Sequence, residues 1–235
     1  PYPFKRFSIV ENRLPTGYAM PTFTLLGQAV VRLPFIVDTS LGHEVLHSWF
    51  GNGVRVDYSQ GNWCEGLTTY LADHAFKNDI NEADQYRKGQ LIAYQSYVHP
   101  DKALPVNDFT NPDLGKSLKQ LAKRSVGYNK VSMIFHMLNK RFGTDLFNQA
   151  LQDFYTRMNG RIAGWDDIQT SFENTTANKL DDFFEQWLTR KDVPKIAIEK
   201  PRLIEEDGQL TVSFTLTQQT DPPYRLSIPV SIRTR

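Results

Sequence analysis

The sequence has little of several features that mark common protein classes, and each shortage excludes a class. A single cysteine, Cys64, rules out a disulfide within the chain. Lysine and arginine number 27 against 26 aspartate and glutamate, a formal charge of +1 without any basic run, so we expect no nucleic-acid partner. The apolar stretches fall far short of a membrane span. The sequence also contains no internal repeat and no low-complexity segment.

The chain opens with Pro1-Tyr2-Pro3 and has neither an initiating methionine nor a charged start followed by an apolar core. We therefore expect a piece of a longer polypeptide that carries an upstream domain. The sequence points to no particular compartment. At 235 residues, the length suffices for one substantial core or for two unequal domains.

The order of local patterns along the chain predicts an α+β fold. Residues 1–37 are β-rich, with strands expected at 4–10 and 22–33. Helical periodicity follows, and it predicts helices at 39–51, 63–77, 82–98, 114–124, 128–142, 145–158, 166–174 and 179–190. Strand-sized apolar runs then occur at 196–198, 210–216 and 226–232. We therefore expect a domain at 1–192, with a β-rich lobe at 1–37 and a helical part at 38–192, and a β-rich C-terminal domain, or part of one, at 193–235.

The most informative segment is His43-Glu44-Val45-Leu46-His47, an HExxH pattern within an expected helix. Histidines four positions apart lie one turn apart on one helix face, so both imidazoles reach a single metal ion. The glutamate between them then lies beside the ion, where it accepts a proton from a bound water. The alternative is a buried helix that merely contains two hydrogen-bonded histidines.

A third candidate ligand, Glu65, follows eighteen positions after the second histidine, near the start of the helix expected at 63–77. Two histidines, one carboxylate and an open fourth position are the ligand set of a catalytic zinc ion. Cap-type residues at 38–40 support the start of the first helix. We therefore predict one Zn²⁺ per chain, with the metal ligands His43, His47 and Glu65.

Other polar residues near these motifs have simpler interpretations. Cys64 adjoins the third ligand, but neighbouring helical positions point about 100° apart, so we expect a packed thiol. Thr69 and Asp73 lie one and two turns beyond that ligand, and they either orient the metal ligands or pack on their own. His74 and His136 are expected to be ordinary surface or core histidines.

Beyond the metal motif, the chain resembles the zinc aminopeptidase family that includes aminopeptidase N, a branch of the thermolysin-like metallopeptidases (gluzincins). Residues 43–52 resemble the family's HExxH-x-W-x-GN motif, and residues 63–66 resemble its W-x-E-G segment with the third ligand. Residues 128–130 are similar to its Tyr-x-Lys segment, and 184–188 resemble the close of its catalytic domain. The match covers roughly residues 15–194, in the family's order.

This resemblance implies a thermolysin-like, mostly helical catalytic domain that binds Zn²⁺ and acts on peptide substrates. Tyr128 is then the group that stabilises the oxyanion during hydrolysis, and Glu44 is the general base. An extended segment upstream would offer a sheet edge on which a peptide lies as an added strand. Its substrate-binding residues are Gly17, Tyr18, Ala19 and Met20.

The sequence departs from the family in two places. Seventeen residues separate His47 from Glu65, one fewer than the family's usual spacing, and a loop absorbs such a deletion easily. More important, Pro21 stands where the family carries a glutamate that binds the free amino terminus of the substrate. Proline has neither a carboxylate nor a backbone N–H. The hydrolytic machinery of the family therefore carries over to this chain, whereas the evidence for selectivity toward amino termini does not.

Together these patterns predict zinc-dependent, aminopeptidase-like hydrolysis of peptide bonds, with exo- or endopeptidase mode left open. A non-peptide hydrolase on the same scaffold is one alternative, because zinc and a tyrosine also open electrophiles such as epoxides. An inactive relative that serves as a binding module is another. Such a copy is expected to lose Glu44, a metal ligand or Tyr128, and the sequence retains all of them.

Overall fold

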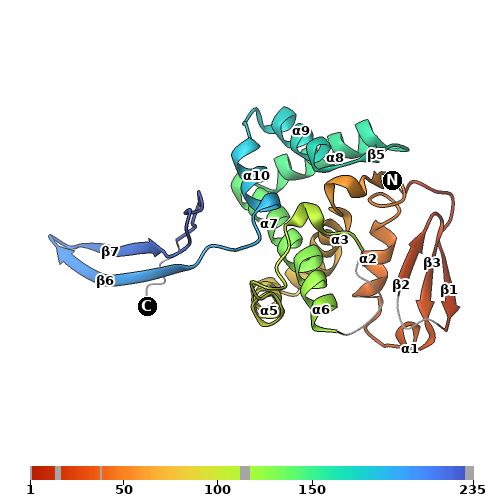
Figure 1. Ribbon diagram of the computed structural model, residues 1–235, viewed down its shortest axis with the longest axis horizontal. Helices are drawn as coiled ribbons and strands as arrows, with labels where there is room; N and C mark the ends of the chain where they lie inside the picture. The colour runs from red at the N-terminus through yellow and green to blue at the C-terminus, as the bar shows by residue number, and fades with distance from the viewer. Residues whose placement is uncertain (1, 14–16, 38, 112–116, 231–235) are drawn as a thin grey trace. The chain divides into compact units, whose positions relative to one another are not determined.

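The computed structural model describes residues 2–13, 17–37, 39–111 and 117–230 (Figure 1). Its internal contacts separate the chain into two compact units, Pro1–Lys191 and Asp192–Arg235. The first unit is mostly helical with two small sheets, and the second contains a two-stranded hairpin.

A three-stranded sheet opens the first unit. Strand β1 (Ser8–Asn12) pairs in parallel with β3 (Phe23–Gly27), and β2 (Gly17–Met20) pairs antiparallel with the other side of β3. β2 therefore lies at an edge of this sheet, and Figure 1 shows that edge beside helix α2 (Ser40–Leu46).

Both strands expected near the start were misplaced. The strand expected at 4–10 begins at Ser8, and the one expected at 22–33 ends at Gly27. The register places Asn12, the last residue of β1, opposite Gly27, so no ladder partner remains beyond this point. The chain turns instead into the short helix α1 (Gln28–Val31), which buries none of its residues.

The expected helices are present, with several bounds shortened or interrupted. Those after α2 are α3 (Cys64–Thr68), α4 (Ala75–Asp79), α5 (Ala83–Tyr97), α6 (Leu118–Arg124), α7 (Val131–Phe142), α8 (Thr144–Met158), α9 (Trp165–Thr176) and α10 (Asp181–Thr189). Two-residue strands β4 (Arg55–Val56) and β5 (Ile162–Ala163) pair in parallel, and 3₁₀ turns form η1 (Tyr58–Gln60) and η3 (Val106–Asp108). The expected helix start at 114 lies outside the described residues.

The start of α2 lacks the side-chain cap that the sequence suggested. Thr39 occupies the N-cap position, but its hydroxyl donates to the carbonyl oxygen of Phe35 (2.9 Å) and not to the helix. Ser40 is already the first helical residue, and Asp38 lies outside the described residues. This helix, expected at 39–51, is helical only to Leu46, so packing holds it rather than capping.

Two π-helical turns, which the periodicity did not predict, occur next to the predicted site. η2 (Thr69–His74) interrupts the helix expected at 63–77, and η4 (Ser125–Lys130) joins α6 to α7. A π turn inserts an extra residue into a helix and is frequent at functional sites. η2 follows the short helix that carries Glu65, and η4 contains Tyr128.

Large aromatic side chains form the core that holds α3 in place. Trp63, at the start of α3, is fully buried and packs edge-on against Phe154 of α8, with ring centroids 5.2 Å apart. Its indole Nε1–H donates to the carbonyl oxygen of Ala163 in β5 (2.8 Å). A buried indole needs such a partner, and this bond orients the first turn of α3 two residues before Glu65.

Helix α3 also crosses η4 at unusually short range. A Cβ atom on Gly66 would overlap the side chain of Val131 and lie 2.9 Å from the carbonyl oxygen of Gly127. A Cβ atom on Gly127 would in turn overlap the ring of Phe109. The two backbones therefore approach where only glycine fits, and the residues next to these glycines are Glu65 and Tyr128.

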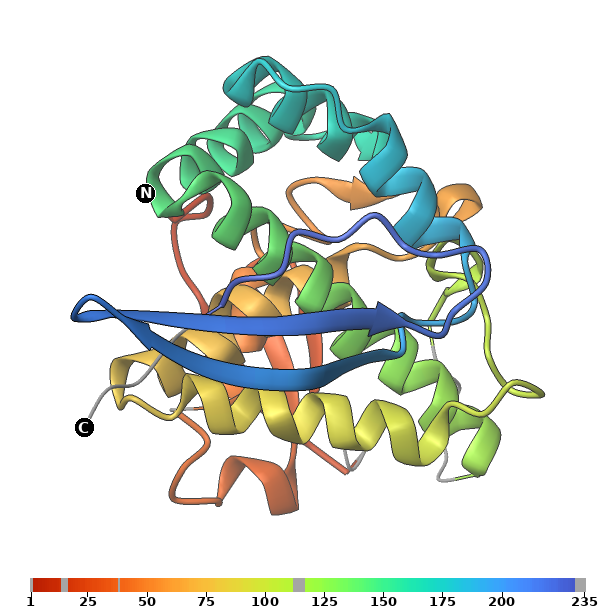
Figure 2. The same ribbon diagram turned by 90° about the vertical axis from the view of Figure 1, so that its left-hand side faces the viewer.

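The second unit contains the antiparallel hairpin of β6 (Ile196–Glu206) and β7 (Gln209–Gln218), whose strands lie side by side in Figure 2. The strands expected at 196–198 and 210–216 are parts of these longer ones. The strand expected at 226–232 is wrong within the described part of the chain, because 226–230 forms no ladder. None of the helices in the described ranges combines the length and apolar character needed to cross a membrane.

Replacing Gly66 with alanine should destabilise the first unit, since the added methyl group overfills the crossing of α3 with η4. Overpacking of this kind costs about 1–3 kcal/mol, and for a chain of this size each kcal/mol lowers Tm by about 2–4 °C. Thermal unfolding measures the change. Gly89→Ala on α5 is the matched control, because a Cβ there meets nothing within 4 Å, and it should not lower Tm. Equal Tm values for both variants would contradict the close crossing.

Candidate active site

The two histidines of the HExxH segment lie together on the buried face of α2. His43 lies within the helix and His47 is its C-cap residue. Their rings are 4.9 Å apart at an interplanar angle of 76°, and the two residues are only 7% and 8% exposed. One helical turn thus presents two imidazoles toward the same point, as the spacing predicts.

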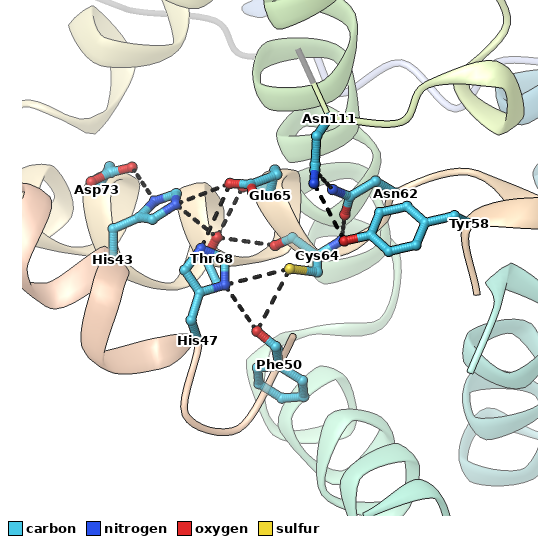
Figure 3. A network of polar contacts seen from close by, with 10 residues as sticks. All are labelled: His43, His47, Phe50, Tyr58, Asn62, Cys64, Glu65, Thr68, Asp73 and Asn111. Atoms are coloured by element: carbon cyan, nitrogen blue, oxygen red, sulfur yellow. Dashed lines mark hydrogen bonds and ion pairs between the residues drawn. The ribbon is translucent and has the colours of Figure 1, made fainter. Parts of the chain in front are cut away.

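Glu65 on α3 completes a group of three converging ligand atoms (Figure 3). Its Oε2 lies 3.3 Å from Nε2 of His43 and 3.6 Å from Nε2 of His47. A tetrahedral zinc ion with bonds of about 2.0–2.1 Å holds its ligand atoms about 3.3 Å from one another. The donor set and its spacing therefore fit a zinc ion that keeps one coordination position for water or substrate.

The outer nitrogen of each ring has its own partner, and this sets which nitrogen faces inward. Nδ1 of His43 lies 3.1 Å from Oδ2 of Asp73, and Nδ1 of His47 donates to the carbonyl oxygen of Phe50 (3.0 Å). With Nδ1 of each ring held by these partners, Nε2 is the atom that faces the centre of the cluster and that would offer its lone pair to a metal ion once the ring is neutral. Figure 3 shows Asp73 on the side of the His43 ring opposite Glu65, and Phe50 below the His47 ring.

Electrostatics couple the buried histidine and carboxylate strongly. Burial alone would lower the pKa of His43, but hydrogen bonds with Asp73 and Glu65 outweigh it and raise this pKa to about 9. Burial would likewise raise the pKa of Glu65, yet its hydrogen bonds to His43 and His47 hold it well below the usual range. Without a metal ion, the pair is thus a protonated imidazole next to a carboxylate.

Glu44 is buried next to this cluster and against the edge strand of the sheet. A Cβ atom on Gly17, in β2, would overlap the Glu44 carboxylate, so the glycine leaves the space that this side chain fills. Burial raises the pKa of Glu44, against the opposing charges of His47 and His43. A carboxylate with a raised pKa is a better proton acceptor than an ordinary glutamate.

Tyr128 faces the cluster from η4. Its ring is stacked on that of His43, with centroids 6.2 Å apart and an interplanar angle of 14°. Burial and the neighbouring Glu65 carboxylate raise the pKa of Tyr128 well above its ordinary value. The phenol therefore keeps its proton throughout the neutral range and can donate a hydrogen bond.

The cluster lies in a cleft of about 630 Å³. Its described lining comprises the four predicted metal-site and base residues, Tyr128, and three of the four residues predicted to bind substrate, Gly17, Tyr18 and Ala19. Met20, the fourth, does not line the cleft and is partly exposed.

The remaining sequence candidates separate clearly. Asp73 contacts a predicted ligand, whereas the buried hydroxyl of Thr69 has no hydrogen-bond partner among the residues that the structure describes. Its neighbour Thr68 contacts the cluster instead, with Oγ1 3.2 Å from Nε2 of His43. Cys64 is a buried thiol, and its Sγ lies on the Nδ1 side of His47 (3.4 Å), as expected for a packed residue.

His74 and His136 do not join the metal cluster. Their rings lie 5.6 Å apart and pack around Tyr70, and the guanidinium of Arg87 contacts Nε2 of His74 (2.6 Å). Both side chains thus belong to a polar patch within the helical core.

Sequence reasoning missed the amides that support the second ligand helix. The side-chain oxygen of Asn62 accepts from the backbone N–H of Cys64 (3.0 Å), and its amide nitrogen donates to Asn111 (2.7 Å). The amide of Asn111 also donates to the hydroxyl of Tyr58 (3.4 Å), which extends this network along the cleft (Figure 3). Asparagine just before a helix was the available signal, since it is a common capping residue.

Zinc binding to the metal-free protein at pH 7.5 should release at least one proton, because a protonated imidazole must lose its proton to coordinate. The pKa of His43 is raised to about 9, and Cys64 and Glu65 outweigh burial and raise the pKa of His47 as well. Calorimetric titration in two buffers of different ionisation enthalpy measures this release, which should fall as the pH approaches 9. Asp73→Asn should reduce zinc affinity about 10–100-fold, since the ring loses its carboxylate partner. Zinc uptake without proton release at pH 7.5 would contradict the coupled pair.

Comparison with known proteins agrees with this geometry. Aminopeptidase N of Escherichia coli (strain K12) is 25% identical over 182 residues, which are 77% of this chain and 20% of that protein. Aminopeptidase N of Rattus norvegicus is 27% identical over 209 residues, 81% of this chain and 20% of that protein. The chain thus spans about a fifth of the length of the curated relatives that it matches.

The fold is similar to that of solved M1 zinc metallopeptidases. The enzyme from Deinococcus radiodurans has a TM-score of 0.61 and 18% identity, over 83% of this chain and 41% of that one. A mutant of that enzyme bound to a Tyr-Ser-Ala substrate also has a TM-score of 0.61, at 17% identity, over 83% and 42%. This likeness concerns the fold, and it confirms the α+β thermolysin-like architecture. The profile of the peptidase family M1 domain matches residues 36–187, most of the chain, which therefore belongs to peptidase family M1.

Proposed function

We propose that this chain hydrolyses peptide bonds in a zinc-dependent reaction at the His43, His47 and Glu65 cluster. The observation that carries the proposal is the convergence of three ligand atoms within 4.8 Å of one another, with Glu44 and Tyr128 facing the same cleft. When bound there, zinc would lower the pKa of a water molecule toward about 7 and polarise the scissile carbonyl. Every other step falls to the side chains of the chain itself.

Glu44 is proposed to move the proton. Its carboxylate lies beside the ligands without being one of them, and it accepts the proton that the attacking water loses. Burial raises the pKa of this carboxyl, which suits the transfer, since a stronger base retains the proton until the leaving nitrogen accepts it. Glu44 then donates the same proton to the leaving amine, so the residue returns to its starting state.

Tyr128 is proposed to stabilise the negative charge that develops on the carbonyl oxygen. Its phenol stays protonated because burial and Glu65 raise its pKa, so the O–H is available as a donor. Stacking against His43 holds the ring beside the cluster before substrate arrives. A fixed donor in a buried site stabilises such charge more than a water molecule would.

Strand β2 is proposed to bind the substrate backbone. It is the edge strand of its sheet, and Gly17, Tyr18 and Ala19 line the cleft. A peptide added along this edge would have its N–H and C=O groups paired by the strand while its scissile bond faces the cluster. Met20 would contribute through its backbone. Pro21 adds no carboxylate to hold an amino terminus, so peptides with blocked amino termini belong among the substrates to test.

The decisive experiment measures zinc content and hydrolysis of free-amino and amino-blocked peptides by the wild type, Glu44→Gln and Tyr128→Phe. Glu44→Gln should keep about one zinc per chain and lose nearly all turnover. Tyr128→Phe should also keep zinc and lose about 10²–10³ in kcat, the usual effect of removing one oxyanion donor.

Each outcome bears on a separate part of the proposal. Cleavage of both peptide sets by the wild type is expected if position 21 is the missing amine anchor, whereas cleavage of free-amino peptides alone would place that anchor elsewhere. A Glu44→Gln variant that hydrolyses peptides as fast as the wild type would overturn the role of Glu44. Failure to bind zinc under any loading condition would overturn the proposal as a whole.

Replacing Gly17 with alanine should lower kcat at least about tenfold, because the added methyl group displaces the Glu44 carboxylate from its space. The group that must shift is the end of a flexible side chain, so zinc content and Tm should stay near their wild-type values. Gly89→Ala provides the same chemical change far from any contact and should retain full activity. An unchanged kcat in Gly17→Ala would show that Glu44 does not need this space.

A further inference from the structure

The charged side chains that line the cleft differ in whether they have a partner of opposite charge. Its three described carboxylates, Glu44, Glu65 and Asp73, all lie within the electrostatic reach of the two histidines, and two of them bond to His43 directly. Arg124 is the one lysine or arginine among the described lining residues. Its side chain is exposed, and no ion pair joins it to a carboxylate in the described ranges.

Arg124 is held at the cleft by its place in the chain and by one contact. It is the last residue of α6, directly before the π turn that carries Tyr128. Its guanidinium carbon lies 5.2 Å from the centroid of the Tyr128 ring, within the range of a cation–π interaction. The guanidinium is thereby positioned next to the proposed oxyanion donor, and none of the carboxylates in the described parts of the chain pairs with its N–H groups.

We propose that Arg124 binds a carboxylate group of the substrate, either the C-terminal carboxylate of a short peptide or an acidic side chain. This inference rests on the proposed peptidase function and names the class of peptide that the same cleft prefers. A guanidinium is always charged and matches the two oxygens of a carboxylate with two parallel N–H donors. In a cleft where the carboxylates already face histidines, it is the group left to recognise an incoming anion.

The distances suit a group close to the scissile bond. The Tyr128 ring contacts both groups: its centroid lies 5.2 Å from the guanidinium carbon of Arg124 and 6.2 Å from the ring centroid of His43. An extended peptide advances about 3.3–3.6 Å per residue. A carboxylate two or three residues from the bond being cleaved therefore reaches Arg124, which favours di- and tripeptides or peptides with an acidic residue at that distance.

A purely positioning role is the competing explanation. The same cation–π contact orients the Tyr128 ring, and removal of Arg124 would then impair catalysis on every substrate alike. The two roles differ in their kinetic signature. Recognition of a carboxylate acts mainly through KM and only on substrates that carry one, whereas support of Tyr128 acts through kcat on all of them.

The test compares the zinc-loaded wild type, Arg124→Gln and Arg124→Lys on matched peptides. One pair is trialanine with a free C-terminal carboxylate and trialanine amide. A second pair is Ala-Ala-Glu amide and Ala-Ala-Gln amide, which carry a side-chain carboxylate or its neutral isostere. Lys123→Gln is the matched control, because it removes the adjacent positive charge of α6 from a side chain that does not line the cleft.

We expect the wild type and Lys123→Gln to prefer one carboxylate-bearing peptide by about 10–100-fold in kcat/KM, the usual strength of a charge-assisted hydrogen bond. The pair that shows the preference identifies the source of the carboxylate. Arg124→Gln should abolish the preference through KM, and Arg124→Lys should retain part of it. Equal rates within both pairs for the wild type, or a uniform loss of kcat in Arg124→Gln, would overturn the proposal.

Binding separates failure of this inference from failure of the proposed function. The Glu44→Gln variant is expected to bind peptides without cleaving them. Calorimetric titration of this variant with the same four peptides therefore measures binding alone. A carboxylate preference in binding that Arg124→Gln removes would support the inference even if the wild type cleaves nothing. Equal affinities for acid and amide would overturn it, whatever the hydrolysis assay shows.

Discussion

The close approach of α3 to η4 is the constraint on which the rest of the site depends. A Cβ atom on Gly66 would overlap the side chain of Val131 and lie 2.9 Å from the carbonyl oxygen of Gly127, and one on Gly127 would overlap the ring of Phe109. Each glycine stands next to a residue of the proposed machinery. A larger residue at position 66 would move α3 away from η4, and Glu65 away from Tyr128, because the close-packed core leaves no space to absorb it. Two fully buried aromatic residues adjoin this crossing: Trp63 at the start of α3, and Phe109, whose ring lies against Gly127.

Buried charge is the second organising feature. Glu65, His43 and Asp73 form a chain of alternating sign, and each member would be costly to bury alone. Pairing makes the cluster tolerable without a metal ion, and it also sets the ring orientation that a metal ion needs. The hydrogen bonds that offset the burial of these charges are therefore the same ones that orient the histidine ring for zinc. Folding of the first unit thus also positions the proposed metal ligands.

The cleft joins two elements with different tasks. The edge strand β2 has backbone groups that are proposed to form hydrogen bonds with an extended peptide of any sequence. Its Gly17 leaves space for Glu44. The junction of α6 and η4 contributes side chains instead, because Arg124 presents a cation there and Tyr128 presents a phenol. We propose that the strand provides affinity for peptides in general, and that the guanidinium of Arg124 favours peptides that carry a carboxylate.

The sequence by itself determined the chemistry of this protein, because ligand type and helical spacing are local properties. Histidines at 43 and 47 share a face in any helix, and an acidic residue at 65 near the start of the next helix completes the set. Helix positions followed from periodicity for the same reason. Strand limits did not: β3 stops at Gly27 because its partner stops at Asn12, a fact about another segment of the chain.

Tertiary structure decided everything that requires two distant segments to meet. The π turns at η2 and η4 are not visible in the periodicity, and neither is the contact of Thr68, rather than Thr69, with Nε2 of His43. The space that Gly17 leaves for Glu44 and the close approach of Gly66 to Gly127 likewise arise from packing between segments far apart in sequence. No periodic pattern encodes such contacts, because they depend on which surfaces the whole core brings together.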